Sequence, residues 1–282
     1  MGQTVKIVTD STSDMSQEEA AKYGITVVPL TVNMDDQIYR DGIDILPPEF
    51  YKRLPKLSKM PTTSQPPVGL FQQTFEKLTS DGSQVISLHI SGDLSGTFNS
   101  ASLAAQGFAP GQVTVIDTRW VTAALALPVI KAAELARSGK EAPEIIQTIK
   151  DTLPYIELLA VADTLEYLKK GGRIGGLAAL AGTILSVKPL FTIRNGKVDR
   201  FENVRTKRKA LERIAEVVKT QWGPLERLAI LHADSPDEAG ELASMLASVF
   251  PLKDIYISMV GPVVGTYAGP KTLGVCAERK AI

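Results

Sequence analysis

One loop of this sequence combines hydroxyl groups and glycines at a spacing that favours anion binding. It is Ser91-Gly92-Asp93-Leu94-Ser95-Gly96-Thr97, and it follows the branched apolar run 85–90, which predicts a buried strand. The residues after Thr97 predict a helix, so the loop connects a strand to a helix. The free N–H groups and the positive end of the helix dipole at such a turn attract an anion. Gly96 lets the backbone approach a ligand closely, and Ser95 adds a hydroxyl donor.

The same loop also allows a purely structural interpretation, in which Ser95 only caps the helix that follows. No lysine follows Gly96, which excludes a P-loop, and the three spaced glycines of a dinucleotide fingerprint are absent. The loop therefore predicts either an anion site or a helix cap, and it disfavours nucleotide binding.

A second polar stretch, Pro61-Thr62-Thr63-Ser64-Gln65-Pro66-Pro67, exposes consecutive side chains that can donate hydrogen bonds. Its prolines are expected to keep it out of helix and sheet. A ligand-binding loop and a solvated linker are equally compatible with these residues alone.

Conventional catalytic signals are sparse. His89 and His232 are the two histidines, each within an apolar run, and Cys276 is the one cysteine, so no metal site is expected. Ser95 has no identifiable base, so no catalytic residue is expected. Asp10 at the end of a predicted strand leaves open a phosphatase or phosphotransferase, with capping of the next turn as the structural alternative.

The composition excludes several classes of protein. The chain has 282 residues, and its 31 lysines and arginines balance 31 aspartates and glutamates, which disfavours a nucleic acid partner. A single cysteine excludes an internal disulfide framework and suits a reducing compartment. We expect no signal peptide at the start, and no apolar run is long enough to cross a bilayer. The expected location is the cytoplasm.

The first half of the chain alternates strands with helices. Its predicted strands are 5–9, 25–32, 85–90 and 113–116. This alternation predicts an α/β fold with a doubly wound, mostly parallel sheet. Ligands of such sheets bind beyond the carboxyl ends of the strands, where Asp10 and Ser95 would meet.

The second half predicts a mixed α/β domain that includes an antiparallel pair. Asn195-Gly196 is typical of a two-residue hairpin turn, and the last expected strand spans 254–259. We place the domain boundary near residue 155, which divides the chain into domains 1–155 and 156–282.

Two stretches of the second half have alternative interpretations. Lys169, Lys170 and Arg173 flank a glycine-rich turn that could contact phosphate or an acidic partner, or could be an ordinary solvated helix end. The apolar run 177–187 is too short to span a membrane and is expected to be buried. Its small residues suit either the lining of an apolar cavity or tight helix packing.

Six motifs, in this order, resemble the pattern of the DegV family of bacterial fatty-acid-binding proteins. They are residues 9–14, 63–66, 91–97, 117–118, 168–174 and 265–270. The resemblance covers essentially the whole chain. It implies two α/β domains with a long-chain fatty acid buried between them as a ligand, without a cofactor. It also implies a lipid-carrying subunit of a fatty acid kinase, without catalytic residues of its own, that presents the carboxylate to a separate ATP-binding subunit for acyl phosphate formation.

Site residues follow from the motif positions of the resemblance. Thr63 and Ser95 resemble the hydroxyls that hold the fatty-acid carboxylate. We expect the neighbouring carboxylate-binding residues to be Thr62, Ser64, Gly96 and Tyr267. The expected lining of the acyl tunnel includes Leu180 and Ile184, and Arg173 resembles an arginine that faces the kinase subunit.

This chain departs from the family pattern at two positions. The pattern usually has histidine where this chain has Tyr267, and glycine where it has Lys271. A tyrosine hydroxyl can still donate to a carboxylate, and Lys271 would add a positive charge nearby. No integral membrane segment is expected, although transient membrane contact stays open, as does a sensor of small molecules that binds no lipid.

Overall fold

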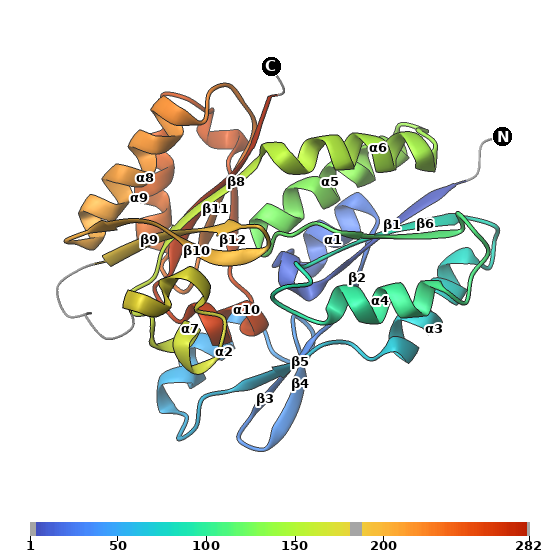
Figure 1. Ribbon diagram of the computed structural model, residues 1–282, viewed down its shortest axis with the longest axis horizontal. Helices are drawn as coiled ribbons and strands as arrows, with labels where there is room; N and C mark the ends of the chain where they lie inside the picture. Colours follow the sequence, from blue (N-terminus) through green and yellow to red (C-terminus); the bar gives the residue numbers. More distant parts are fainter. Residues whose placement is uncertain (1–3, 181–187, 281–282) are drawn as a thin grey trace.

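The computed structural model describes residues 4–180 and 188–280, and a four-stranded parallel sheet forms its N-terminal part (Figure 1). In spatial order its strands are β2 (Ile25–Val28), β1 (Val5–Asp10), β6 (Gln84–His89) and β7 (Val113–Asp117). All three neighbouring pairs are parallel. The strand predicted over 25–32 is too long, because β2 ends at Val28 and the chain leaves the sheet at Pro29.

Helices cover both faces of this sheet, which confirms the doubly wound prediction. Figure 1 places α5 and α6 on one face and α3 and α4 on the other. The helices of the N-terminal part are α1 (Gln17–Tyr23), α2 (Pro47–Arg53), α3 (Val68–Thr79), α4 (Thr97–Ala105), α5 (Ala123–Arg137) and α6 (Ala142–Thr152). Each face is sealed by aliphatic and aromatic side chains, with Phe71 and Phe75 of α3 fully buried.

A small antiparallel sheet projects from the N-terminal part. Its strands, in spatial order, are β4 (Gln37–Arg40), β3 (Thr31–Met34) and β5 (Thr62–Ser64). The prediction that prolines keep residues 61–67 out of a sheet is wrong, because the prolines flank the strand without interrupting it. Val32 of β3 lies opposite Thr63 of β5, so the sheet holds Thr63 at a defined position.

The C-terminal part is a six-stranded mixed sheet, as predicted. In spatial order its strands are β10 (Lys197–Val204), β9 (Lys188–Arg194), β8 (Ile156–Val161), β13 (Leu273–Arg279), β11 (Leu225–His232) and β12 (Tyr256–Met259). The sequence interpretation missed β13, which pairs antiparallel with both β8 and β11. The predicted hairpin at Asn195-Gly196 is confirmed, since it joins β9 to β10.

Helices also pack on the C-terminal sheet. They are α7 (Glu166–Lys170), α8 (Lys207–Gln221), α9 (Pro236–Leu246) and α10 (Pro262–Ala268). Helices α8 and α9 bury one face of the sheet, where Leu211, Ile214 and Leu242 are among the buried side chains. The other face turns toward the N-terminal part. In the two described ranges, no helix combines the length and the hydropathy that crossing a bilayer requires.

Candidate functional site

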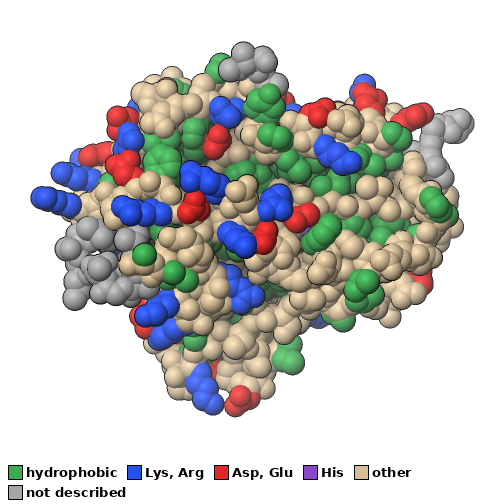
Figure 2. Space-filling view, in the orientation of Figure 1, with side chains coloured by type: hydrophobic (Ala, Val, Ile, Leu, Met, Phe, Trp, Pro, Cys, Tyr) green, Lys and Arg blue, Asp and Glu red, His purple; other side chains and the backbone are tan. Residues whose placement is uncertain are grey.

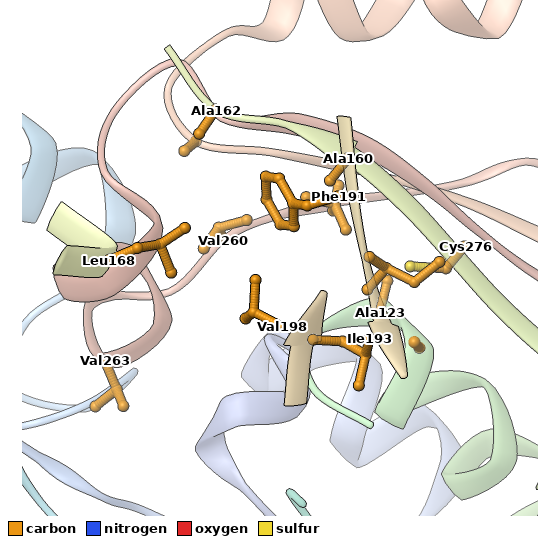
Figure 3. Close-up of a cluster of buried hydrophobic side chains, with 14 of the residues drawn as sticks. Ala123, Ala160, Ala162, Leu168, Phe191, Ile193, Val198, Val260, Val263 and Cys276 are labelled. Carbon is orange, nitrogen blue, oxygen red and sulfur yellow. The ribbon is translucent and has the colours of Figure 1, made fainter. Parts of the chain in front are cut away.

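The candidate site is an apolar pocket between the two larger sheets. It has about 840 Å³ of space free of protein atoms, including the part that opens to solvent. Aliphatic and aromatic side chains from both halves line most of it, among them Leu30, Ile90, Leu158, Phe191, Val198 and Val263. Figure 3 shows how Phe191, Val198 and Val260 gather within this shared hydrophobic cluster. Pockets of this kind bury the greater part of a small apolar ligand.

The pocket lining includes several polar side chains, among them Thr12, Thr122 and Thr272. Four others are Thr63, Ser95, Arg173 and Tyr267, which we call the polar cluster, because Tyr267 contacts Thr63 and Arg173, and Arg173 contacts the loop that carries Ser95. The Oγ1 atom of Thr63 lies 2.5 Å from the hydroxyl oxygen of Tyr267, so strand β5 and helix α10 meet at this bond. Among the described residues that line the pocket, Arg173 is the one ionised side chain. The cluster therefore combines three neutral hydroxyls with a single cation.

Ser95 owes its position to the loop that Ser91 organises. The backbone carbonyl of Ser91 accepts hydrogen bonds from the N–H groups of Leu94 and Ser95, and the Ser91 hydroxyl donates to Gly196 O at 2.8 Å. The hairpin turn of the C-terminal sheet thus holds the loop in place. Gly196 has φ +77°, and a Cβ atom there would lie 2.5 Å from the Ser91 hydroxyl oxygen, so this turn needs glycine.

Ser95 is not the N-cap residue of α4, which corrects the structural interpretation of this loop. The N-cap is Gly96, which has no side chain that could accept a hydrogen bond from the helix. The Ser95 hydroxyl lies 2.8 Å from Thr97 Oγ1 and accepts a bond of 3.3 Å from the Thr97 N–H group. Ser95 also lines the pocket, and its hydroxyl can still make one further hydrogen bond.

The Arg173 side chain lies over the ring of Tyr267. Its guanidinium carbon lies 4.6 Å from the ring centroid of Tyr267, a cation–π geometry. Its Nε donates to Leu94 O at 3.3 Å, and one terminal nitrogen donates to Gly171 O at 2.8 Å. Arg173 thus connects the Ser95 loop to the end of α7 while its side chain stays exposed.

The other residues expected around the carboxylate lie outside the pocket lining. Thr62 and Ser64 flank Thr63 on β5, and alternation along a strand turns both to the opposite, exposed face. Gly96 is half-buried beneath the side chain of Gln65. Lys271 is not part of the lining either, and it has a left-handed backbone with φ +60°.

The described residues say little about the two residues that were expected to line the acyl tunnel. Ile184 lies outside them, and Leu180 ends the 3₁₀ helix Gly175–Leu180 without a described side chain. The prediction that 177–187 is buried is confirmed at Leu177 and wrong at Ala178 and Ala179, which are exposed. Among the described residues, much of the apolar wall comes from side chains of β8, β9, β10 and β11, which sequence reasoning did not single out. Their alternation along each strand was the signal that could have found them.

Asp10 is a structural group in this fold. Its side chain is fully buried and accepts bonds from Thr12 N at 3.0 Å and Ile90 N at 3.1 Å. It also accepts from the Thr12 hydroxyl at 2.5 Å and lies 2.9 Å from His89 Nδ1. A carboxylate with four partners and no exposed surface has no free oxygen for phosphate or magnesium. This geometry disfavours the Asp10-dependent phosphatase.

Ser87, His89 and Asp10 have the connectivity of a catalytic triad without its access to substrate. His89 Nε2 lies 2.6 Å from the Ser87 hydroxyl, and His89 Nδ1 faces Asp10. All three side chains are 0% exposed, and the Phe71 ring stacks edge-on to His89 with centroids 5.0 Å apart. A nucleophile must reach its substrate, so this triad holds β1 and β6 together instead of supporting catalysis.

Comparison with known proteins decides the family. The protein-family model described as "Uncharacterised protein, DegV family" matches residues 4–280 of this chain. The chain belongs to the DegV family. A DegV domain-containing protein of Deinococcus radiodurans is 41% identical over 278 residues, which cover 98% of each chain.

Solved structures of several similar proteins share this fold. A DegV family protein from Thermus thermophilus, described as binding fatty acid, has a TM-score of 0.92 at 35% identity and covers 99% of this chain and 100% of its own. DegV of Bacillus subtilis, described as a fatty acid binding protein, has a TM-score of 0.90 at 32% identity with the same coverage. A stearic acid-binding protein of Eubacterium ventriosum reaches 0.86 at 27% identity and covers 98% of each chain.

Proposed function

We propose that this DegV protein binds a long-chain fatty acid in the pocket between its two larger sheets. The observation that carries the proposal is the combination of a mainly apolar lining with the polar cluster in the same pocket. The apolar lining suits an acyl chain, and the clustered hydroxyls suit its carboxylate. The DegV proteins of Thermus thermophilus and Bacillus subtilis, described as binding fatty acid, support the same ligand class.

Burial of the acyl chain supplies most of the binding free energy in this proposal. A chain of about sixteen carbons buries about fifteen methylenes at ~0.8 kcal/mol each, or about 12 kcal/mol before the costs of association. Even after those costs, the ligand is expected to stay bound through purification. The shared core cluster supplies partners for the methylenes from both halves of the molecule.

The carboxylate is held by Thr63 and Ser95 in this proposal, with Tyr267 as a third neutral donor. A carboxylate that leaves water needs hydrogen bonds to compensate for its desolvation. Hydroxyl donors provide them without a tight salt bridge, which leaves the carboxylate oxygens able to react. Arg173 adds positive charge next to the Tyr267 ring.

A carboxylate whose oxygens stay able to react fits the carrier role that the family resemblance implies. We infer that the protein presents its fatty acid to a separate ATP-dependent kinase subunit, which forms the acyl phosphate, and that it has no catalytic residues of its own. Arg173 is the exposed member of the polar cluster, as a partner-facing residue must be. Figure 2 shows lysine and arginine side chains gathered over the region of β9, β10 and α7.

Organic extraction of the purified protein, followed by mass spectrometry, tests the ligand. The expected result is a long-chain fatty acid in near-stoichiometric amount. A polar metabolite in its place would instead support the sensor of small molecules. A protein that arrives empty and fails to bind added fatty acid overturns the proposal.

Kinase coupling needs a separate test. A DegV-associated kinase subunit is incubated with ATP, fatty acid and this protein, and acyl phosphate is trapped as its hydroxamate. Product is expected only when all components are present, and Arg173→Gln is expected to reduce its formation more than it reduces fatty acid binding. Product formation that ignores this protein would contradict the carrier role.

A further inference from the structure

The side chain of Gln65 covers the backbone of Gly96. Gln65 follows β5 directly, and a Cβ atom built on Gly96 would lie 2.6 Å from Gln65 Cδ and 2.7 Å from its Nε2, with Oε1 in contact as well. These separations are far shorter than van der Waals contact. The Gln65 amide therefore occupies the space that any other residue at position 96 would need.

The same amide is also bonded to α4. Gln65 Nε2 donates to Ser100 Oγ at 2.9 Å, and the Ser100 side chain is buried. The Ser100 N–H group in turn donates to Gly96 O at 3.0 Å. Gln65 thus contacts both the start of α4 and its first turn.

This bridge joins the two segments that carry the site hydroxyls. Thr63 lies two residues before Gln65 on β5, and Ser95 lies directly before Gly96. Strand β5 belongs to the small antiparallel sheet, whereas α4 follows a strand of the parallel sheet. Among the described hydrogen bonds, the one between Gln65 and Ser100 is the single bond from residues 61–67 to residues 91–105.

We propose that Gln65 is a positioning residue that sets the distance between the Thr63 and Ser95 hydroxyls. This inference rests on the proposed fatty-acid site and names a residue that makes it selective for a carboxylate. Two donors can share one carboxylate only when their separation matches its two oxygens. The contact of Gln65 with α4 keeps that separation constant, because neither donor then moves independently of the other.

The test compares two ligands of equal chain length on delipidated protein. A long-chain fatty acid and the corresponding long-chain alcohol bury the same methylenes but differ in the head group. Gln65→Ala is expected to raise the Kd of the acid about 10-fold and to change that of the alcohol less than about 2-fold. Gln72→Ala, which removes an exposed amide of α3 bonded to Glu76, is the matched control and is expected to change neither Kd.

A second variant, at Gly96, disturbs the same contact between Gln65 and α4. Gly96→Ala has an ordinary backbone conformation, with φ −73°, but its methyl group must push the Gln65 amide away. It is expected to reproduce the loss of acid affinity, and the double variant is expected to be no weaker than the single ones. Such non-additivity identifies residues that act through one contact.

Two results would overturn the role of Gln65. In the first, Gln65→Ala weakens acid and alcohol equally, which indicates a general loss of pocket structure. In the second, the effects of Gln65→Ala and Gly96→Ala add up, which indicates independent causes. A wild-type protein that binds neither ligand would instead refute the proposed function and is recognised before any variant is compared.

Discussion

Tyr267 is the residue at which the two halves of the molecule meet in the polar cluster. Its hydroxyl contacts Thr63 from the N-terminal part, and its ring makes a cation–π contact with the Arg173 guanidinium. A phenol hydroxyl can donate one hydrogen bond and accept others, and a fixed partner such as Thr63 holds it in place. The head-group site of this protein therefore depends on geometry more than on charge.

Tyr267→Phe is expected to weaken fatty acid binding about 3- to 10-fold, since it removes one hydrogen-bond donor and keeps the ring beneath Arg173. The measurement is a displacement titration with a fluorescent fatty acid. Tyr155→Phe is a matched control, because Tyr155 also has an arginine, Arg279, over its ring and does not line the pocket. Equal affinities for Tyr267→Phe and the wild type would exclude a role of this hydroxyl.

Asp10→Asn is expected to destabilise the protein by about 2–4 kcal/mol, because an amide cannot accept from all four donors that surround this buried carboxylate. Denaturant unfolding followed by circular dichroism measures the change. Asp254→Asn, at an exposed position, is expected to stay within about 0.5 kcal/mol of the wild type. A stable Asp10→Asn variant that has lost a magnesium-dependent hydrolysis would favour the phosphatase interpretation.

At the scale of elements, a strand, a loop and a helix from different parts of the fold form the site. Strand β5 supplies Thr63, the loop between β6 and α4 supplies Ser95, and α10 supplies Tyr267. The end of α7 packs directly against α10, where Gly171 leaves space for the Tyr267 ring. Close approach of these elements is thus a condition for the polar cluster.

Gly171→Ala tests this close approach. An added Cβ would lie 2.7 Å from Tyr267 Cε1 and would also contact Cδ1, so the ring must shift, which disturbs its hydrogen bond with Thr63. We expect fatty acid affinity to fall about 10-fold and the midpoint of thermal unfolding to decrease by a few degrees. Gly240→Ala in α9, where nothing lies within 4 Å of the new methyl group, is expected to leave binding unchanged. An unaltered Kd for Gly171→Ala would show that the ring can move without cost.

At the scale of the whole molecule, the two larger sheets share a core instead of sitting apart. Helix α5 packs on β1 and also on β11 and β13, and one hydrophobic cluster draws from both halves. We propose a division near residue 155, since every later strand enters the six-stranded sheet. Tyr51 donates to Val260 O at 3.0 Å, and Ser258 donates to Asp14 O at 3.1 Å across this division.

Two buried carboxyl groups lie at the same seam and make its stability depend on pH. Asp14 accepts a bond of 3.0 Å from Gly261 N, and a Cβ on Gly261 would lie 3.4 Å from Asp41 Oδ1. Burial raises the pKa of Asp14 well above its usual range and raises the pKa of Asp41 to about 7, with the Asp10 charge as a smaller contribution to both. The native state thus retains protons that the unfolded chain has already released.

Because the folded pKa exceeds the unfolded one, the free energy of unfolding is expected to fall as pH rises from about 4 to about 7. Asp41→Asn removes one of these titrations and is expected to flatten this decline. The variant should be more stable than the wild type at pH 8 by about 2–4 kcal/mol. Urea unfolding at several pH values measures the effect. A variant whose stability runs parallel to that of the wild type from pH 4 to 8 would contradict the assignment to Asp41.

The sequence by itself determined the fold class, the parallel N-terminal sheet, the hairpin at Asn195-Gly196 and the resemblance that led to the family. These features depend on local periodicity, on turn residues and on motif order, all of which are visible along one chain. It missed β13 and misread β5, because both strands depend on partners far away in the sequence.

Only the tertiary structure decided which polar residues share a pocket. From the sequence, Thr62 and Ser64 are expected near the carboxylate together with Thr63, and strand pairing with β3 places Thr63 alone of the three in the pocket lining. Likewise, the sequence leaves Asp10 open as a residue of a phosphatase or phosphotransferase. In the fold, its side chain is buried and fully hydrogen-bonded. The physical reason is that side-chain direction and burial follow from long-range packing, which no local pattern encodes.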